Sequence, residues 1–178
     1  MAKTPRTNDD RVRAAKGARA SALKLVPANG AVDDLVTAVG RTRRRVIHLL
    51  DVDLGPGEPT GMWIATDQAD YVVHPADASA AERTAVICHE LAHMLLGHQP
   101  QAEGDPSVRM ATVVAPDIDP EVAQRFLRRH GYAELVEAEA EHLGTLLVAQ
   151  LARNAEAQVV RRDAVSDRLR WSSKPPWF

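Results

Sequence analysis

Two histidines and a glutamate stand close together in the segment Cys88-His89-Glu90-Leu91-Ala92-His93. Residues four apart lie on one face of an α-helix, so the imidazoles of His89 and His93 can reach one metal ion. A Zn²⁺ ion with two histidines, a third protein ligand and an open position can lower the pKa of a water molecule to about 7. Glu90 lies about 100° further round the helix axis, where it could act as general base. The pattern predicts metal-assisted hydrolysis.

These side chains need a helix that carries them into the protein interior. Ser79 is the expected N-cap, with Glu82 as its capping-box partner, and Gly97 is the expected stop. We therefore expect a core helix, because the intervening sequence has a wide apolar surface made by Ala85, Val86, Cys88, Leu91, Ala92, Leu95 and Leu96. The alternative, two core histidines without a metal, is disfavoured by their four-residue spacing and the intervening glutamate.

A catalytic zinc site needs a third protein ligand. In the extended pattern His-Glu-x-x-His-x-x-Gly-x-x-His that ligand is the last histidine, but here Gln99 stands at its position and Leu96 replaces the glycine. This class is therefore disfavoured, and His98 is expected to support the site from outside or to face solvent. A downstream acidic helix offers carboxylates instead, and Glu134, Glu137 and Glu141 share one side of it, so one of them can face inward.

The remaining sequence predicts an α+β fold: a small twisted sheet of about three strands, packed on the zinc-binding core helix, with further C-terminal helices. Residues 1–28 are basic and rich in alanine and are expected to form a frayed helix or a disordered arm. A helix is expected over 31–39, ending at Gly40. Further expected elements are strands over 46–50, 61–66 and 70–74, the last two forming a hairpin, a long loop over 99–120, and helices over 121–129 and 132–153.

The composition of the chain limits the classes of protein to which it can belong. The chain has 178 residues, of which 45% are hydrophobic and 26% charged, with a net charge of −2, as in a globular domain without an overall attraction to nucleic acid or membranes. The arginines between 41 and 45 are expected to form a solvated turn, not a nucleic-acid site. Cys88 is the only cysteine, which excludes an intrachain disulfide. With no apolar signal segment or membrane span, a cytoplasmic protein is expected.

The chain resembles the ImmA/IrrE family of metallo-endopeptidases, particularly its actinobacterial regulatory and toxin-like members. The resemblance covers residues 43–150, and its last motif, Glu137-x-Glu139-Ala140-x-x-Leu143, is similar to the family's Glu-x-Glu-Ala-x-x-Phe-Ala. It implies that Glu137 is the third zinc ligand and that Glu141 supports a ligating histidine. Because Leu143 and Gly144 depart from the family pattern, Glu134 and Glu139 stay open as alternatives. The other segments that carry the resemblance are 61–66, 70–73 and 89–98.

The resemblance also implies a thermolysin-like zinc core and an endopeptidase that cleaves a regulatory protein at a specific site, such as a helix-turn-helix repressor. On this interpretation residues 29–153 form the metallopeptidase-like domain and 154–178 a C-terminal extension. Tyr132, His130 and His142 are candidates for stabilising the oxyanion. The alternative function is a zinc-containing binding module that regulates a transcription factor or a toxin–antitoxin partner without proteolysis.

Overall fold

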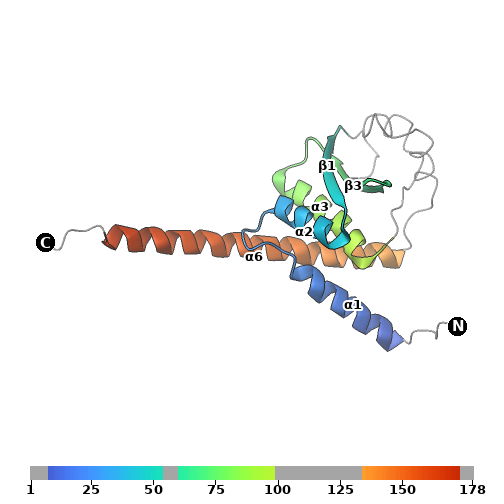
Figure 1. Cartoon of the computed structure of the whole chain (residues 1–178), viewed down its shortest axis with the longest axis horizontal. Helices are drawn as coiled ribbons and strands as arrows, with labels where there is room; N and C mark the ends of the chain where they lie inside the picture. Colours follow the sequence, from blue (N-terminus) through green and yellow to red (C-terminus); the bar gives the residue numbers. More distant parts are fainter. Residues whose placement is uncertain (1–7, 54–59, 99–133, 173–178) are drawn as a thin grey trace, which may run out of the picture.

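The protein has an α+β fold, with helices packed against a small mixed sheet (Figure 1). The computed structural model describes residues 8–53, 60–98 and 134–172. The predicted 99–120 loop and 121–129 helix lie outside these ranges. The described elements are α1 (Asn8–Leu23), α2 (Val32–Arg43), β1 (Val46–Val52), β2 (Met62–Ala65), β3 (Ala69–Pro75), α3 (Ala80–Leu96) and α6 (Glu134–Ser172).

The sheet has three described strands in the order β1-β3-β2, which confirms the predicted number. β3 pairs in parallel with β1, where Leu49 lies opposite Val72, and antiparallel with β2, where Met62 lies opposite Val73. The hairpin expected between β2 and β3 is confirmed, because the backbone N–H of Thr66 donates to the carbonyl oxygen of Ala69 at 2.9 Å. This topology makes β2 an edge strand among the strands that the structure describes.

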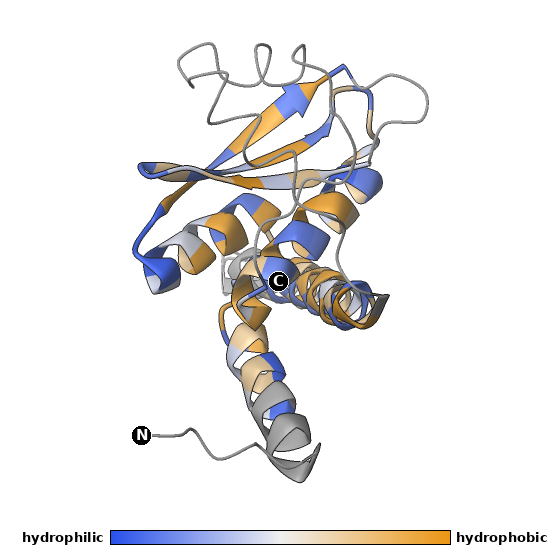
Figure 2. Cartoon of the chain, turned by 90° about the vertical axis from the view of Figure 1, so that its right-hand side faces the viewer, coloured by the Kyte–Doolittle hydropathy of each residue, from blue (hydrophilic) through white to orange (hydrophobic). Residues whose placement is uncertain are grey.

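The main core lies between one face of the sheet and the helices (Figure 2). Val72 of β3, Leu91 of α3 and Leu143 of α6 are all fully buried. The inward face of α6 continues along the helix with Ala140, Leu147 and Leu151. Leu135 has the apolar side chain of a core residue, but it is 71% exposed. It lies in the first turn of α6, away from the inward-facing stripe.

Helix α3 forms between the predicted caps. The hydroxyl of Ser79 accepts a hydrogen bond from the backbone N–H of Glu82 at 3.3 Å, and the Glu82 carboxylate accepts one from the backbone N–H of Ser79 at 2.9 Å. At the other end, Gly97 adopts the left-handed conformation with φ 72°. These local interactions fix both ends of the motif helix, as the sequence predicted.

Helix α2 does not end at Gly40 as predicted. It continues to Arg43, and Arg44 takes the left-handed C-cap position with φ 58°. Gly40 is buried inside the helix, where a Cβ atom would come within 2.7 Å of the carbonyl oxygen of Arg45. The glycine therefore permits a close approach between the helix and the following segment.

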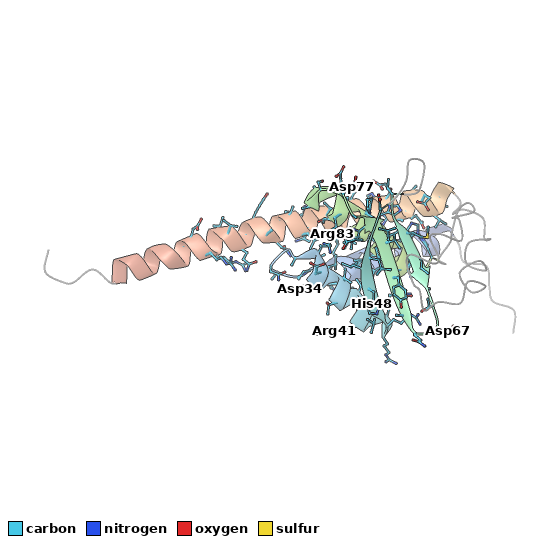
Figure 3. The ribbon with its side chains drawn as sticks, turned by 90° about the horizontal axis from the view of Figure 1, so that it is seen from above. Asp34, Arg41, His48, Asp67, Asp77 and Arg83 are labelled. Carbon is cyan, nitrogen blue, oxygen red and sulfur yellow. The ribbon has the colours of Figure 1, made fainter. Side chains whose placement is uncertain are left out.

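Two arginines from the predicted solvated turn hold the sheet to the helices. Arg43 and Arg45 form ion pairs with Asp70 Oδ2 at 3.2 and 3.1 Å, and Asp70 is fully buried. Arg43 also donates to the carbonyl oxygen of Met94 at 3.0 Å, and its guanidinium lies 4.9 Å from the ring centre of Trp63. Arg41, by contrast, is exposed at the carboxyl end of α2 (Figure 3). Part of the arginine cluster therefore positions α3 and is not a solvated turn.

Helix α6 is longer than the sequence predicted. It runs without interruption from Glu134 to Ser172, so the predicted domain boundary at 153/154 falls inside it, and its C-terminal part projects beyond the sheet and the other helices (Figure 1). The α1–α2 connection crosses α6, where Asn154 Nδ2 donates to the carbonyl oxygen of Pro27 at 2.9 Å. In the described ranges, no helix combines the length and apolar character needed to cross a membrane.

Candidate metal centre

The crossing of α3 over α6 positions the candidate site. Gly144 lies at the point of contact, and a Cβ atom there would be 3.2 Å from the Cα of His89 and 3.3 Å from its backbone nitrogen. These distances are tighter than ordinary van der Waals contacts, so the missing side chain allows the two helices to approach closely. Glu137 stands two turns before Gly144 on the same helix. The close crossing therefore brings a carboxylate of α6 next to the histidines of α3.

Three potential ligand atoms converge at this crossing. His89 Nε2 lies 3.0 Å from His93 Nε2 and 3.3 Å from Glu137 Oε2, and His93 Nε2 lies 3.6 Å from Glu137 Oε1. Ligand atoms about 2.0–2.1 Å from a tetrahedral metal ion are about 3.3 Å apart. The observed distances bracket that value, so His89, His93 and Glu137 could hold a metal ion.

Glu90 is buried directly beside these groups. Its side chain comes from the same helix as the histidines and is 7% exposed. Burial, and to a smaller extent the negative charge of Glu137, raise its pKa to about 8, although a backbone hydrogen bond from Trp63 of β2 opposes the increase. A carboxyl group with a pKa near neutrality is suited to exchange protons with a reacting group.

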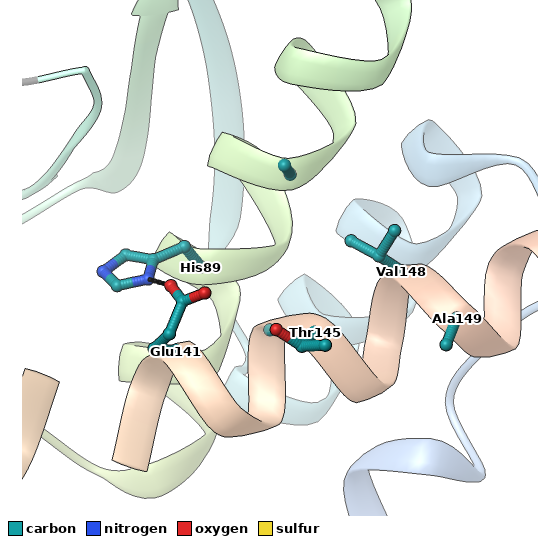
Figure 4. Close-up of a pocket in the computed structure, with 7 residues that line it drawn as sticks. His89, Glu141, Thr145, Val148 and Ala149 are labelled. Carbon is teal, nitrogen blue, oxygen red and sulfur yellow. Dashed lines mark ion pairs between the residues drawn. The ribbon is translucent and has the colours of Figure 1, made fainter. Parts of the chain in front are cut away.

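The ring nitrogens that face away from the convergence point have partners as well. His89 Nδ1 lies 3.4 Å from Glu141 Oε2, in the position that the resemblance implies for a supporting carboxylate (Figure 4). His93 Nδ1 lies 3.0 Å from His98 Nδ1, and His98 Nε2 lies 3.6 Å from Glu139 Oε2. The Nδ1 atom of each candidate ligand histidine is thus in contact with a further titratable side chain, which can fix the orientation of the ring.

The electrostatic environment keeps His93 neutral. Its pKa falls to about 3 because burial, and then the neighbouring His89 and His98, disfavour the charged ring. A neutral imidazole has a free lone pair, which a metal ligand requires. Cys88, one residue before His89, is fully buried, and burial raises the pKa of its thiol to about 12. Cys88 therefore stays a protonated core residue, in agreement with its place on the apolar surface of the expected helix.

A cavity of about 290 Å³ opens beside the candidate site in the groove between α3 and α6 (Figure 4). His89 and Glu141 form its polar end, and Thr145 lies next to them on α6. The rest of its wall is apolar. The lining residues are Ala85, His89, Glu141, Gly144, Thr145, Val148 and Ala149.

The structure separates the four carboxylates that the sequence left open as ligands. Glu137 meets both histidines, Glu141 contacts the outer side of His89, and Glu139 contacts His98. The side chain of Glu134 lies outside the described residues, as do Tyr132 and His130. His142, the remaining oxyanion candidate, is exposed on α6.

The sequence left two positions open for His98, and the structure places it against His93 and mostly buried, not toward solvent. The backbone N–H of His98 donates to the carbonyl oxygen of His93 at 3.0 Å, and that of Gly97 donates to the carbonyl oxygen of Met94 at 3.3 Å. These are the two bonds of a Schellman motif, which brings the residue after the glycine back over the last turn of the helix. Gly97 was therefore a signal that could have placed His98 against His93.

Comparisons of the chain with protein-family models, with curated proteins and with solved structures found no match. The functional interpretation consequently depends on the geometry of the candidate site and on the motifs that carry the resemblance.

Proposed function

We propose that this protein is a zinc-dependent endopeptidase of the ImmA/IrrE type, with a thermolysin-like core, that cleaves a regulatory protein in the cytoplasm. The observation that carries the proposal is the convergence of His89, His93 and Glu137 beside a buried Glu90. Two imidazoles and one carboxylate form a ligand set typical of catalytic zinc. A zinc ion bound there would supply a water molecule of lowered pKa.

Glu90 is the proposed general base. It would accept a proton from the attacking water and later donate it to the leaving amine. The charge of Glu137 contributes to the raised pKa of Glu90. A divalent cation beside Glu137 would offset that charge and favour the Glu90 carboxylate, which is the form that accepts a proton.

Strand β2 supports a peptide as the substrate. It is an edge strand of the described sheet, and its Trp63 has a backbone hydrogen bond to Glu90. An extended peptide that adds to such an edge would lie next to the proposed base. Recognition of a helix-turn-helix repressor is an implication of the family resemblance.

The proposal can be tested with the variant Glu90→Gln, which keeps the size of the side chain but cannot act as a base. Parent and variant should bind equal amounts of zinc, whereas only the parent should cleave. Purified helix-turn-helix repressors from the source organism serve as substrates, and labelling of new N-termini in cells that express either form extends the search. A parent protein that binds zinc and produces no Glu90-dependent cleavage, but retains its regulatory effect, would support the non-proteolytic binding module.

A further inference from the structure

A chain of contacts runs from the surface of α6 to one of the candidate metal ligands. It begins at Glu139, whose Oε2 lies 3.6 Å from His98 Nε2, and continues from His98 Nδ1 to His93 Nδ1 at 3.0 Å. His93 Nε2 ends the chain at the convergence point, 3.0 Å from His89 Nε2. Glu139 is 37% exposed at its side chain, His98 10% and His93 1%, so the contacts become progressively more buried toward the site.

The chemistry of these groups allows one consistent arrangement of protons around a bound metal. A neutral imidazole carries one N–H and one lone pair, and an ionised carboxylate only accepts hydrogen bonds. Glu139 therefore favours an N–H on His98 Nε2, which leaves a lone pair on His98 Nδ1. That lone pair favours an N–H on His93 Nδ1, and the lone pair of His93 is then on Nε2, facing His89 and Glu137.

We propose that His98 and Glu139 are positioning residues that fix the tautomer and the ring orientation of His93 for metal binding. The inference extends the proposed function, on which its metal ligand set rests. The backbone supports it independently, because the Schellman motif at Gly97 holds His98 over His93 through hydrogen bonds that do not involve the rings. The two rings meet at an angle of 66° with centres 5.1 Å apart, so an edge of one ring faces the other.

The side chains that contact Nδ1 of His89 and Nδ1 of His93 differ in their exposure to solvent, which provides a matched comparison. Glu141 contacts His89 Nδ1 directly, and its side chain is 74% exposed, whereas His98 lies between His93 and its carboxylate and is mostly buried. Water can replace an exposed partner more readily than a buried one. Loss of His98 should therefore affect metal affinity more than loss of the Glu141 carboxylate.

The first test measures the tautomers in the parent protein by nitrogen-15 NMR of the histidine rings, without and with zinc. The expected result is a proton on Nδ1 of His93 and on Nε2 of His98 in both samples. A proton on Nε2 of metal-free His93 or on Nδ1 of His98 would overturn the proposal. This experiment needs no variant, so it does not depend on whether a substituted protein folds.

The second test measures zinc affinity by competition with a chelating dye. His98→Leu removes the acceptor and should weaken binding by about 10- to 100-fold, the usual effect of losing such a partner. His98→Asn places an amide oxygen near the position of Nδ1 and should restore most of the affinity. Glu141→Gln is the matched control and should change the affinity less than His98→Leu does.

Equal zinc affinity in the parent and His98→Leu, or equal losses in His98→Leu and His98→Asn, would overturn the proposal. These results are separate from those that test proteolysis. Zinc binding that depends on His98 in a protein without cleavage activity would reject the proposed function alone. Glu90-dependent cleavage with zinc affinity unchanged in His98→Leu would reject the positioning role alone.

Discussion

Replacing Glu90 by glutamine should stabilise the metal-free protein by an amount that grows with pH. The pKa of Glu90 is about 8 in the folded protein, against an ordinary value of 4.5. Between these values the folded state keeps the proton while the unfolded state releases it, so the free energy of unfolding of the parent falls as pH rises. The glutamine side chain of the variant has no proton to release, so the variant lacks this decrease.

The size of the effect follows from the width of that pH window. It spans about 3.5 pH units, and each unit corresponds to about 1.4 kcal/mol, so the upper limit is on the order of 5 kcal/mol at pH 8. His93 acts in the opposite direction, because its pKa falls to about 3 in the folded protein from 6.5. The stability that the neutral His93 contributes is lost as the pH falls from 6.5 toward about 3. This loss is the same in the parent and in the variant.

The assay is urea denaturation of both proteins at pH 5, 6, 7 and 8 in the presence of a chelator. The difference between their free energies of unfolding should increase with each step. In zinc-loaded protein the increase should shrink, because the cation favours the Glu90 carboxylate. A difference that stays constant from pH 5 to 8 in the metal-free proteins would refute the reasoning about burial and charge.

Three further substitutions test the packing that supports the site. Asp70→Ala should lower the free energy of unfolding by about 3–5 kcal/mol in denaturant titrations, because it leaves Arg43 without its buried partner. Gly30→Ala should cost more than about 1 kcal/mol in the same assay, since its φ is +71° and a Cβ atom would meet α6. Gly144→Ala should weaken zinc affinity about tenfold in dye competition by displacing Glu137, and unchanged affinity would contradict the close-crossing interpretation.

Structural features that depend on contacts within a few residues were predictable from the sequence. Ser79, Glu82 and Gly97 fix the ends of α3 through contacts within one turn, and the strands appear near their predicted positions. The end of α2 was predicted wrongly, because the left-handed C-cap position falls to Arg44, a residue that rarely adopts a positive φ, and not to Gly40.

The contacts between α3 and α6 could be identified only from the structure. Glu137 and Glu139 are both partly buried, and they stand three and four residues before the buried Ala140 and Leu143. Spacing along α6 therefore does not separate them, and only the packed helix shows that Glu137 contacts both candidate ligand histidines. The C-terminal continuation of α6 was missed because it lacks a periodic apolar stripe, which is the main sequence signal for a helix that packs on a core.

Zinc stoichiometry tests the central claim most directly. Elemental analysis after dialysis against trace zinc should find one zinc ion per parent chain and a loss of bound zinc in Glu137→Ala. Glu134→Ala should keep its zinc, because the site is built on Glu137 with His89 and His93. A parent chain without zinc, or a Glu137→Ala protein that retains one zinc ion per chain, would contradict the proposed metal centre.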